Sequence, residues 1–277
     1  MVGGGRSVCR FSRRASGTDA VVNPRANALI RLADPVRIGL VKLRARVRPR
    51  ARLGARKDFR QPDLANAWGG PFNGQEARKQ IATEVIALMQ PAAVVETGSY
   101  RGTTTAFFRD SGLPVYTVEL KPQLYHYVRR RFRRDESVEV ALGDSRDYLD
   151  RLSKRGDVPK ARVLFYLDAH WEDDLPVQEE LEMIRRVWRE SVVMVDDFEV
   201  PDDPVYGFDD YGPGRALSLS SLQIEELGYR IFWPSTPGEE ETGERRGCVV
   251  LATPDEAAQR ISGVIGLRPQ NPREGGT

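Results

Sequence analysis

From residue 75 onward, short apolar segments alternate with segments of helical periodicity, and few folds accommodate that pattern. Five segments of strand length are separated by four stretches whose apolar residues recur every three or four positions. Strands that alternate with helices favour a parallel sheet covered by helices on both faces. The expected strands are residues 93–98, 114–120, 138–144, 162–168 and 191–197.

The remaining elements complete a doubly wound α/β domain. A polar, Glu-rich loop separates two further apolar segments, which predicts an antiparallel pair at the edge of the sheet. These two strands are expected at residues 229–235 and 246–253. The sequence therefore predicts seven strands, five of them parallel. Helices are expected over residues 75–89, 103–111, 122–134, 145–153, 176–189 and 217–227.

Charge is distributed unevenly along the chain. Residues 1–60 contain 16 Lys/Arg and three Asp/Glu, a net charge of +13, whereas the remainder contains 26 basic and 37 acidic residues, a net charge of −11. Residues 1–22 lack periodicity and are expected to be disordered, and residues 24–48 have apolar positions at roughly helical spacing. Such basic arms bind nucleic acid or anionic membranes, and a solvated tail is the alternative.

Three regions are expected: a basic N-terminal extension over 1–60, an α/β domain over 61–265 and a frayed tail over 266–277. Within them, Pro49 is expected to end the amphipathic segment, and residues 50–74 are expected to form a linker. The apolar stripe of residues 24–48 is expected to pack on the α/β domain or on a partner subunit, and the second alternative would make the protein a homo-oligomer.

The cysteine content and the hydropathy indicate a cytoplasmic protein. Cys9 and Cys248 are the only cysteines, which argues against a disulfide framework and fits a reducing compartment. No apolar run approaches the roughly 18 residues of a membrane span. The N-terminus carries arginines but no apolar core of a secretory signal.

Acidic residues and glycines follow the expected strands, where an open parallel sheet binds its ligands. Gly98 and Gly102 follow the first strand and allow a tight turn with a close backbone approach, although an ordinary turn is the alternative. Glu119 ends the second strand, about 20 positions later, and suits hydrogen bonds from ribose hydroxyls. Asp144 ends the third strand and is placed to accept a hydrogen bond from an adenine amine.

This series, Glu96-x-Gly98-x-x-x-Gly102 with Glu119, Asp144 and Asp168, resembles the class I S-adenosylmethionine (SAM)-dependent methyltransferases over about residues 75–253. Their sheet also has five parallel strands followed by an antiparallel hairpin. Ser99 and Tyr100 depart from the commoner loop, which has a further glycine there. The resemblance implies that Glu96 and Gly98 lie near the methionine part of SAM, that Glu119 holds the ribose and that Asp144 meets the adenine. The implied cofactor-binding group is Glu96, Gly98, Ser99, Gly102, Glu119, Asp144 and Ser145.

Three carboxylates are expected to converge where the fourth and fifth strands end. Asp168 ends one strand, and Asp196 and Asp197 end its neighbour. Crowded like charges raise one another's pKa, and a hard divalent cation such as Mg²⁺ relieves that repulsion. Asp168, Asp196 and Asp197 are therefore predicted metal ligands, and a plain acidic strand end is the alternative.

His170 follows two positions after Asp168 and is one of only two histidines in the chain. The arrangement resembles the metal-dependent O-methyltransferases of the catechol and antibiotic-sugar types. In the sugar enzymes an acid at the position of His170 serves as general base. An imidazole with an ordinary pKa of about 6.5 can also accept a proton at neutral pH. His170 and Asp168 are the predicted catalytic residues, and a structural histidine is the alternative.

The predicted function is metal-assisted, SAM-dependent O-methylation of a small hydroxylated molecule, such as a sugar or a polyketide-like metabolite. Residues 206–214 are expected to form a mobile substrate lid, and residues 68–75 are expected to cover the cofactor. Two alternatives stay open. One is a methyltransferase fold that binds RNA or another polyanion through its basic arm, and the other is a non-catalytic scaffold.

Overall fold

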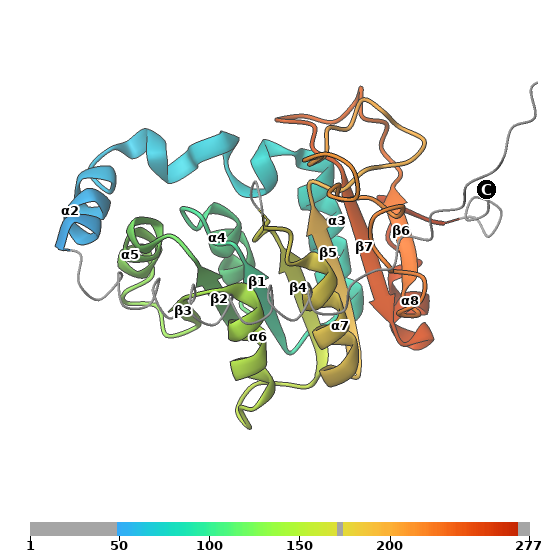
Figure 1. The fold of residues 1–277 in the computed structure, drawn as a ribbon, viewed down its shortest axis with the longest axis horizontal. Helices are drawn as coiled ribbons and strands as arrows, with labels where there is room; N and C mark the ends of the chain where they lie inside the picture. The colour runs from blue at the N-terminus through green and yellow to red at the C-terminus, as the bar shows by residue number, and fades with distance from the viewer. Residues whose placement is uncertain (1–48, 171–173, 271–277) are drawn as a thin grey trace, which may run out of the picture. The chain divides into compact units, whose positions relative to one another are not determined.

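A single mixed sheet forms the centre of the computed structural model, which describes residues 49–170 and 174–270. Its strand order is β3-β2-β1-β4-β5-β7-β6-β8 (Figure 1). The first five of these strands in that order are parallel, as the sequence predicted. They are β1 (Ala93–Thr97), β2 (Val115–Glu119), β3 (Val138–Leu142), β4 (Ala161–Leu167) and β5 (Glu190–Asp196).

The register of the central strands determines where the site lies. Thr97 of β1 is opposite Leu167 of β4, which in turn is opposite Val195 of β5. The three strands therefore end at the same edge of the sheet. Residues that directly follow them, such as Gly98 and Asp168, are brought together although they are far apart in the sequence.

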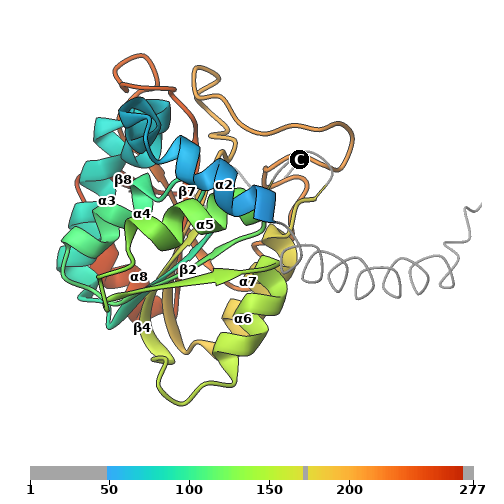
Figure 2. The ribbon, with the colours of Figure 1, turned by 90° about the vertical axis from the view of Figure 1, so that its left-hand side faces the viewer.

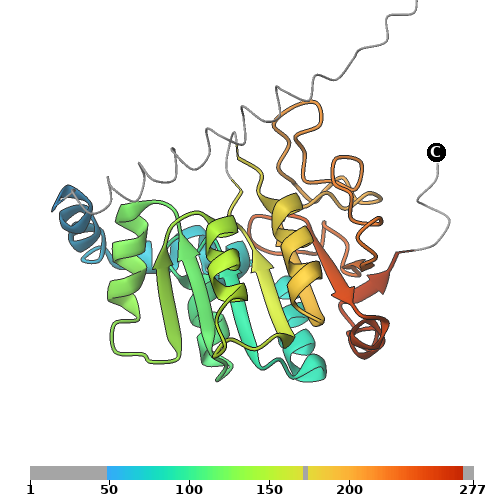
Figure 3. The same ribbon diagram turned by 60° about the horizontal axis from the view of Figure 1, so that its bottom comes forward.

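Helices cover both faces of the sheet because neighbouring residues of each buried strand point to opposite sides. Val94 of β1 packs in the core of one face and Val95 in the core of the other. Helices α6 and α7 lie over the second face (Figure 3). The helices of the first face are α3 (Glu76–Met89), α4 (Thr103–Asp110), α5 (Pro122–Arg131) and α8 (Asp255–Ile261), and those of the second are α6 (Ser145–Ser153) and α7 (Val177–Val187).

The C-terminal strands extend the sheet beyond β5. Strand β7 (Cys248–Thr253) is antiparallel to both β5 and β6 (Arg230–Pro234), which confirms the predicted antiparallel pair. The edge is formed by a third strand, β8 (Leu267–Pro269), which pairs with β6. The prediction of a frayed tail from residue 266 is therefore wrong for this strand, which buries Leu267 and gives the sheet eight strands.

Two other predictions differ from the structure. Residues 217–227 form consecutive turns instead of a helix, with Leu217 and Ile224 buried in the core. Residues 50–74, predicted as a linker, contain helix α2 (Pro49–Asp58) and the 3₁₀ segments η1 (Pro62–Gly69) and η2 (Pro71–Gly74). Pro49, predicted to end the amphipathic segment, is the first described residue and belongs to α2, and the segment before it lies outside the described residues.

Helix α2 packs along α5 at the β3 end of the sheet (Figure 2). The predictions for residues 1–22 and 24–48 lie outside the described residues. Within the described ranges, no helix is long and apolar enough to cross a membrane.

Candidate functional site

A cavity of about 580 Å³ lies beyond the carboxyl ends of the parallel strands. Eight of the predicted site residues line it, and they come from both the expected cofactor group and the expected metal group. They are Gly98, Ser99, Glu119, Asp144, Ser145, Asp168, His170 and Asp197. A second cavity of about 680 Å³ lies beside β6 and α8 and contains none of these residues.

The glycine loop brings the backbone of β1 against that of β4. Gly98 has a φ of +84°, and a Cβ atom there would lie 1.9 Å from the backbone oxygen of Asp168. Only glycine fits this close approach. Gly102 also has a positive φ, at the N-terminus of α4, but it does not line the cavity.

Glu119 is fixed by the backbone of two neighbouring loops. Its carboxylate accepts hydrogen bonds from the N–H groups of Tyr100, at 2.9 Å, and Lys121, at 2.7 Å. Burial raises the pKa of Glu119 to about 7, although these two N–H groups oppose the shift. A positioned acceptor of this kind on the cavity wall suits a ligand that carries hydroxyl groups.

Asp144 is already paired within the protein. Its carboxylate caps α6 by accepting from the N–H of Arg146 at 2.9 Å, and it also accepts from that guanidinium at 2.7 Å. Burial opposes ionisation, but the contacts with Arg146 outweigh it and lower the pKa of Asp144. Asp144 therefore lines the cavity as an ionised group whose orientation is set by Arg146.

Glu96 lies beneath the cavity and does not line it. Its side chain is buried and accepts hydrogen bonds from the hydroxyls of Thr105, at 2.5 Å, and Thr117, at 2.6 Å. Burial raises the pKa of Glu96 to about 7 against the effect of these hydroxyls. The prediction that Glu96 meets the cofactor is corrected: this carboxylate ties β1 to α4 and β2.

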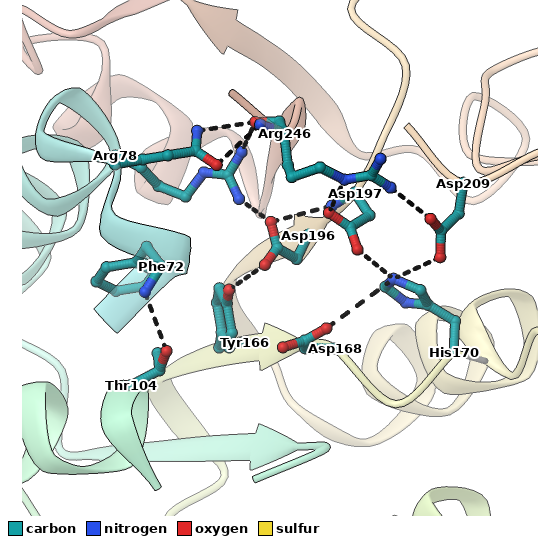
Figure 4. Close-up of polar contacts among 11 residues, drawn as sticks. Phe72, Arg78, Thr104, Tyr166, Asp168, His170, Asp196, Asp197, Asp209 and Arg246 are labelled. Carbon is teal, nitrogen blue, oxygen red and sulfur yellow. Dashed lines mark hydrogen bonds and ion pairs between the residues drawn. The ribbon is translucent and has the colours of Figure 1, made fainter. Parts of the chain in front are cut away.

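Three carboxylates surround the buried imidazole of His170 (Figure 4). Its Nε2 atom lies 3.6 Å from Asp197, 3.7 Å from Asp209 and 4.0 Å from Asp168. Neither ring nitrogen has a hydrogen bond among the described residues. Ligand atoms of Asp168, His170 and Asp197 all lie within 4.8 Å of one another, which is a donor set that could hold a metal ion.

The charges of this cluster are only partly balanced. Burial and the charges of Asp197 and Glu96 raise the pKa of Asp168 well above its ordinary value, while His170 offsets part of the shift. Burial would also raise the pKa of Asp197, but His170 and Arg246 hold it at about 2. Burial lowers the pKa of His170, and the surrounding carboxylates outweigh it and raise the pKa. The carboxylates of the cluster therefore favour the protonated form of His170.

Asp196 does not join this cluster, contrary to the prediction that it binds metal. It forms a buried ion pair with Arg78 of α3 and accepts a hydrogen bond from the hydroxyl of Tyr166 at 2.5 Å. Asp197, the next residue, has a φ of +52° and lies on the cavity wall. The two neighbouring carboxylates thus have different tasks, one structural and one facing the cavity.

Arg246 is a site residue that the sequence analysis did not identify. Its guanidinium donates to Asp197 at 2.7 Å and to Asp209, and it holds these two side chains beside His170. A signal was present, because Arg246 stands two residues before β7, whose Cys248 is opposite Asp196 of β5. An antiparallel neighbour begins where β5 ends, so the start of β7 had to lie near the site.

The two predicted covering loops border the cavity in part. Asp209 and Tyr211 of the predicted lid line it, as do Trp68 and Asn73 of the segment before α3. Phe72 instead points into the core, where its ring packs against those of Phe107, Phe108 and Tyr166.

Comparison with known proteins gives similarity in fold. No family model and no curated protein matches the chain. The O-methyltransferase TomG from Streptomyces achromogenes, involved in tomaymycin synthesis and solved with SAM, is 17% identical, with a TM-score of 0.47 over 75% of this chain and 91% of its own. Cofactor-bound Rv0187 from MTB is 20% identical, with a TM-score of 0.49 over 74% and 90%. An O-methyltransferase from Bacillus cereus in complex with SAH is 15% identical, with a TM-score of 0.46 over 64% and 81%.

These similarities concern the fold of the backbone alone.

Proposed function

We propose that this protein is a SAM-dependent methyltransferase that methylates a hydroxyl group of a small polar metabolite with the help of a divalent cation. One observation carries the proposal: a single cavity has the Gly98 loop and Glu119 on one part of its wall and the Asp168–His170–Asp197 cluster on another. Its volume of about 580 Å³ lies within the range of pockets for small ligands.

The residues fit a divalent cation. The Asp168 carboxylate makes no hydrogen bond among the described residues, and within them its one ion pair is with His170 at 4.0 Å. Mg²⁺ is commonly held by one or two carboxylates and keeps several waters, so Asp168 and Asp197 suffice as ligands. A bound cation would lower the pKa of an acceptor hydroxyl and orient it. In this assignment His170 is not a metal ligand, so its Nε2 atom can accept a proton.

The chain's own residues then have defined tasks. The loop at Gly98 forms part of the wall against which the cofactor would lie, and Glu119 accepts from the ribose hydroxyls. As the acceptor oxygen bonds to the methyl carbon, the bond from that carbon to sulfur breaks, and the hydroxyl proton passes to Nε2 of His170. The carboxylates of Asp168, Asp197 and Asp209 stabilise the imidazolium that results. Arg246 keeps two of these carboxylates in position.

Replacing Asp168 by Asn should lower metal-stimulated methyl transfer by about a hundredfold, on the order of the contribution of a positioned electrostatic group. SAM affinity should stay within about threefold of wild type, because Asp168 faces the acceptor side. Radiolabel transfer from SAM to a panel of sugars and catechols, with Mg²⁺, Mn²⁺ or chelator, measures the effect. Asp210→Asn is the matched control, since Asp210 is exposed and lies next to Asp209. Equal turnover in both variants would refute the assignment.

SAM affinity should weaken at low pH through Glu119. The pKa of this carboxyl is raised to about 7 by burial, and its ionised form is the better acceptor for ribose hydroxyls. The affinity should thus fall as pH falls through 7, by about tenfold between pH 8 and pH 6. Calorimetry on Glu119→Gln, which cannot ionise, should show weaker binding and a much smaller pH dependence. The same dependence in this variant would assign the effect to another group.

A further inference from the structure

Helices α2 and α5 form one continuous surface. Ala51 and Ala55 of α2 are buried against the domain, and a Cβ atom at Gly54 would lie only 2.7 Å from the side chain of Gln123 in α5. Gln123 also donates a hydrogen bond to Asp58 at 2.8 Å. Figure 2 shows the two helices side by side at this end of the sheet. Their outer sides therefore act as a single surface.

This surface carries cations without matching carboxylates. We call it the basic face and define it as the exposed arginines and lysine of residues 50–60 and 129–134. Within the described part of the chain, none of these side chains forms an ion pair. The nearby carboxylate of Asp58 is already engaged by Gln123 and lies 3.7 Å from Arg101.

Cations from both helices lie close to a histidine of α5. Burial lowers the pKa of His126 on α5, and the charges of Arg52 and Arg129 lower it further. Arg52 belongs to α2 and Arg129 to α5, so both helices contribute to one positive region. The guanidinium of Arg130 lies over the ring of Phe59, at 4.9 Å. A surface of this kind gains free energy when an anion covers it.

The chemistry of the face favours phosphates along a polymer. All but one of its cations are arginines, whose planar guanidinium groups bind phosphate oxygens through two hydrogen bonds. A membrane-surface helix needs an apolar face to bury, but Leu53 is the one large apolar side chain that α2 exposes. We propose that the basic face binds the phosphodiester backbone of single-stranded RNA.

The position of the face relates it to the cavity. Lys121 and Leu124, at the start of α5, line the cavity wall. A strand bound along α5 would therefore pass the rim of the cavity. This docking site is independent of the metal cluster, which lies beyond β4 and β5.

The test is anisotropy of a labelled RNA of about 20 nucleotides with the full chain, between about 50 and 200 mM salt. The face variant combines Arg52→Gln, Arg56→Gln, Arg129→Gln and Arg133→Gln. Its affinity should fall at least about tenfold, and the slope of log affinity against log salt should decrease by about 3, since each phosphate contact contributes about 0.7. Thermal unfolding and SAM binding should stay unchanged, which shows that the variant is folded.

Two matched controls distinguish the contribution of the basic face to RNA affinity from the contributions of net charge and of the basic N-terminal arm. The body control neutralises Arg151, Arg162, Arg186 and Arg189, and the arm control neutralises Arg13, Arg14, Arg44 and Arg46. Each should bind RNA more tightly than the face variant. The proposal is overturned if wild type does not bind RNA, if the arm control alone removes binding, or if the face is needed only for vesicles of phosphatidylcholine and phosphatidylserine.

Discussion

Replacing Arg78 by Met should destabilise the protein by about 3–5 kcal/mol, as expected when one partner of a buried ion pair is removed. The side chains of Arg78 and Asp196 are both 1% exposed, and the variant would leave the Asp196 carboxylate buried without its counter-charge. Arg78 also donates to the backbone oxygen of Arg246. Urea unfolding measures the loss, and Arg246 and its carboxylate partners should become less ordered.

Two further variants make this prediction specific. Arg109→Met removes a surface ion pair with Asp135, at 2.7 Å, and should cost less than about 1 kcal/mol. Combining Arg78→Met with Asp196→Asn should recover part of the stability, because no buried charge then lacks a partner. A single variant within about 1 kcal/mol of wild type would contradict the account, as would a double variant no more stable than the single one.

Replacing Gly98 by Ala should abolish SAM binding and lower stability by about 2–4 kcal/mol, the sum of overpacking and left-handed backbone strain. The added methyl group would lie 1.9 Å from the Asp168 oxygen and 2.5 Å from its carbonyl carbon. Both are backbone atoms, so the ends of β1 and β4 must move apart. That displacement would shift the loop at Gly98 and would also change the positions of Glu119 and Asp168 in the cavity wall.

Gly112→Ala is the matched control for Gly98→Ala. Gly112 has a φ of +81°, nearly the same as Gly98, but a Cβ atom there would meet nothing within 4 Å. It should cost only about 1 kcal/mol from backbone strain and leave SAM binding unchanged. Equal effects of the two substitutions in calorimetry and urea unfolding would show that the contact between β1 and β4 is unimportant.

The strand pattern predicted most of the fold because buried parallel strands are continuous apolar runs that end at polar residues. The same reasoning located Glu119, Asp168 and His170, since the carboxyl ends of neighbouring parallel strands meet at one edge. The prediction of a helix over residues 217–227 was wrong. Their apolar spacing resembles that of a helix, but in the structure Leu217 and Ile224 are buried side chains of successive turns.

The different roles of Asp196 and Asp197 could not be predicted from the sequence pattern. Two adjacent carboxylates at a strand end differ in whether the side chain faces the cavity or the core. A buried partner on another element determines which carboxylate faces the core. Here Arg78, more than 100 residues earlier in the chain, holds Asp196. Arg246 also comes from a distant part of the chain, 49 residues after Asp197 and 37 after Asp209, and neither arginine belongs to a local motif.

Calorimetric titration of the full chain with SAM, beside NAD as a control ligand, shows which cofactor the cavity binds. We expect binding of SAM, no binding of NAD, and loss of the SAM signal in Gly98→Ala but not in Gly112→Ala. Binding of NAD, or no binding of SAM with or without Mg²⁺, would contradict the assignment of this cavity to methyl transfer.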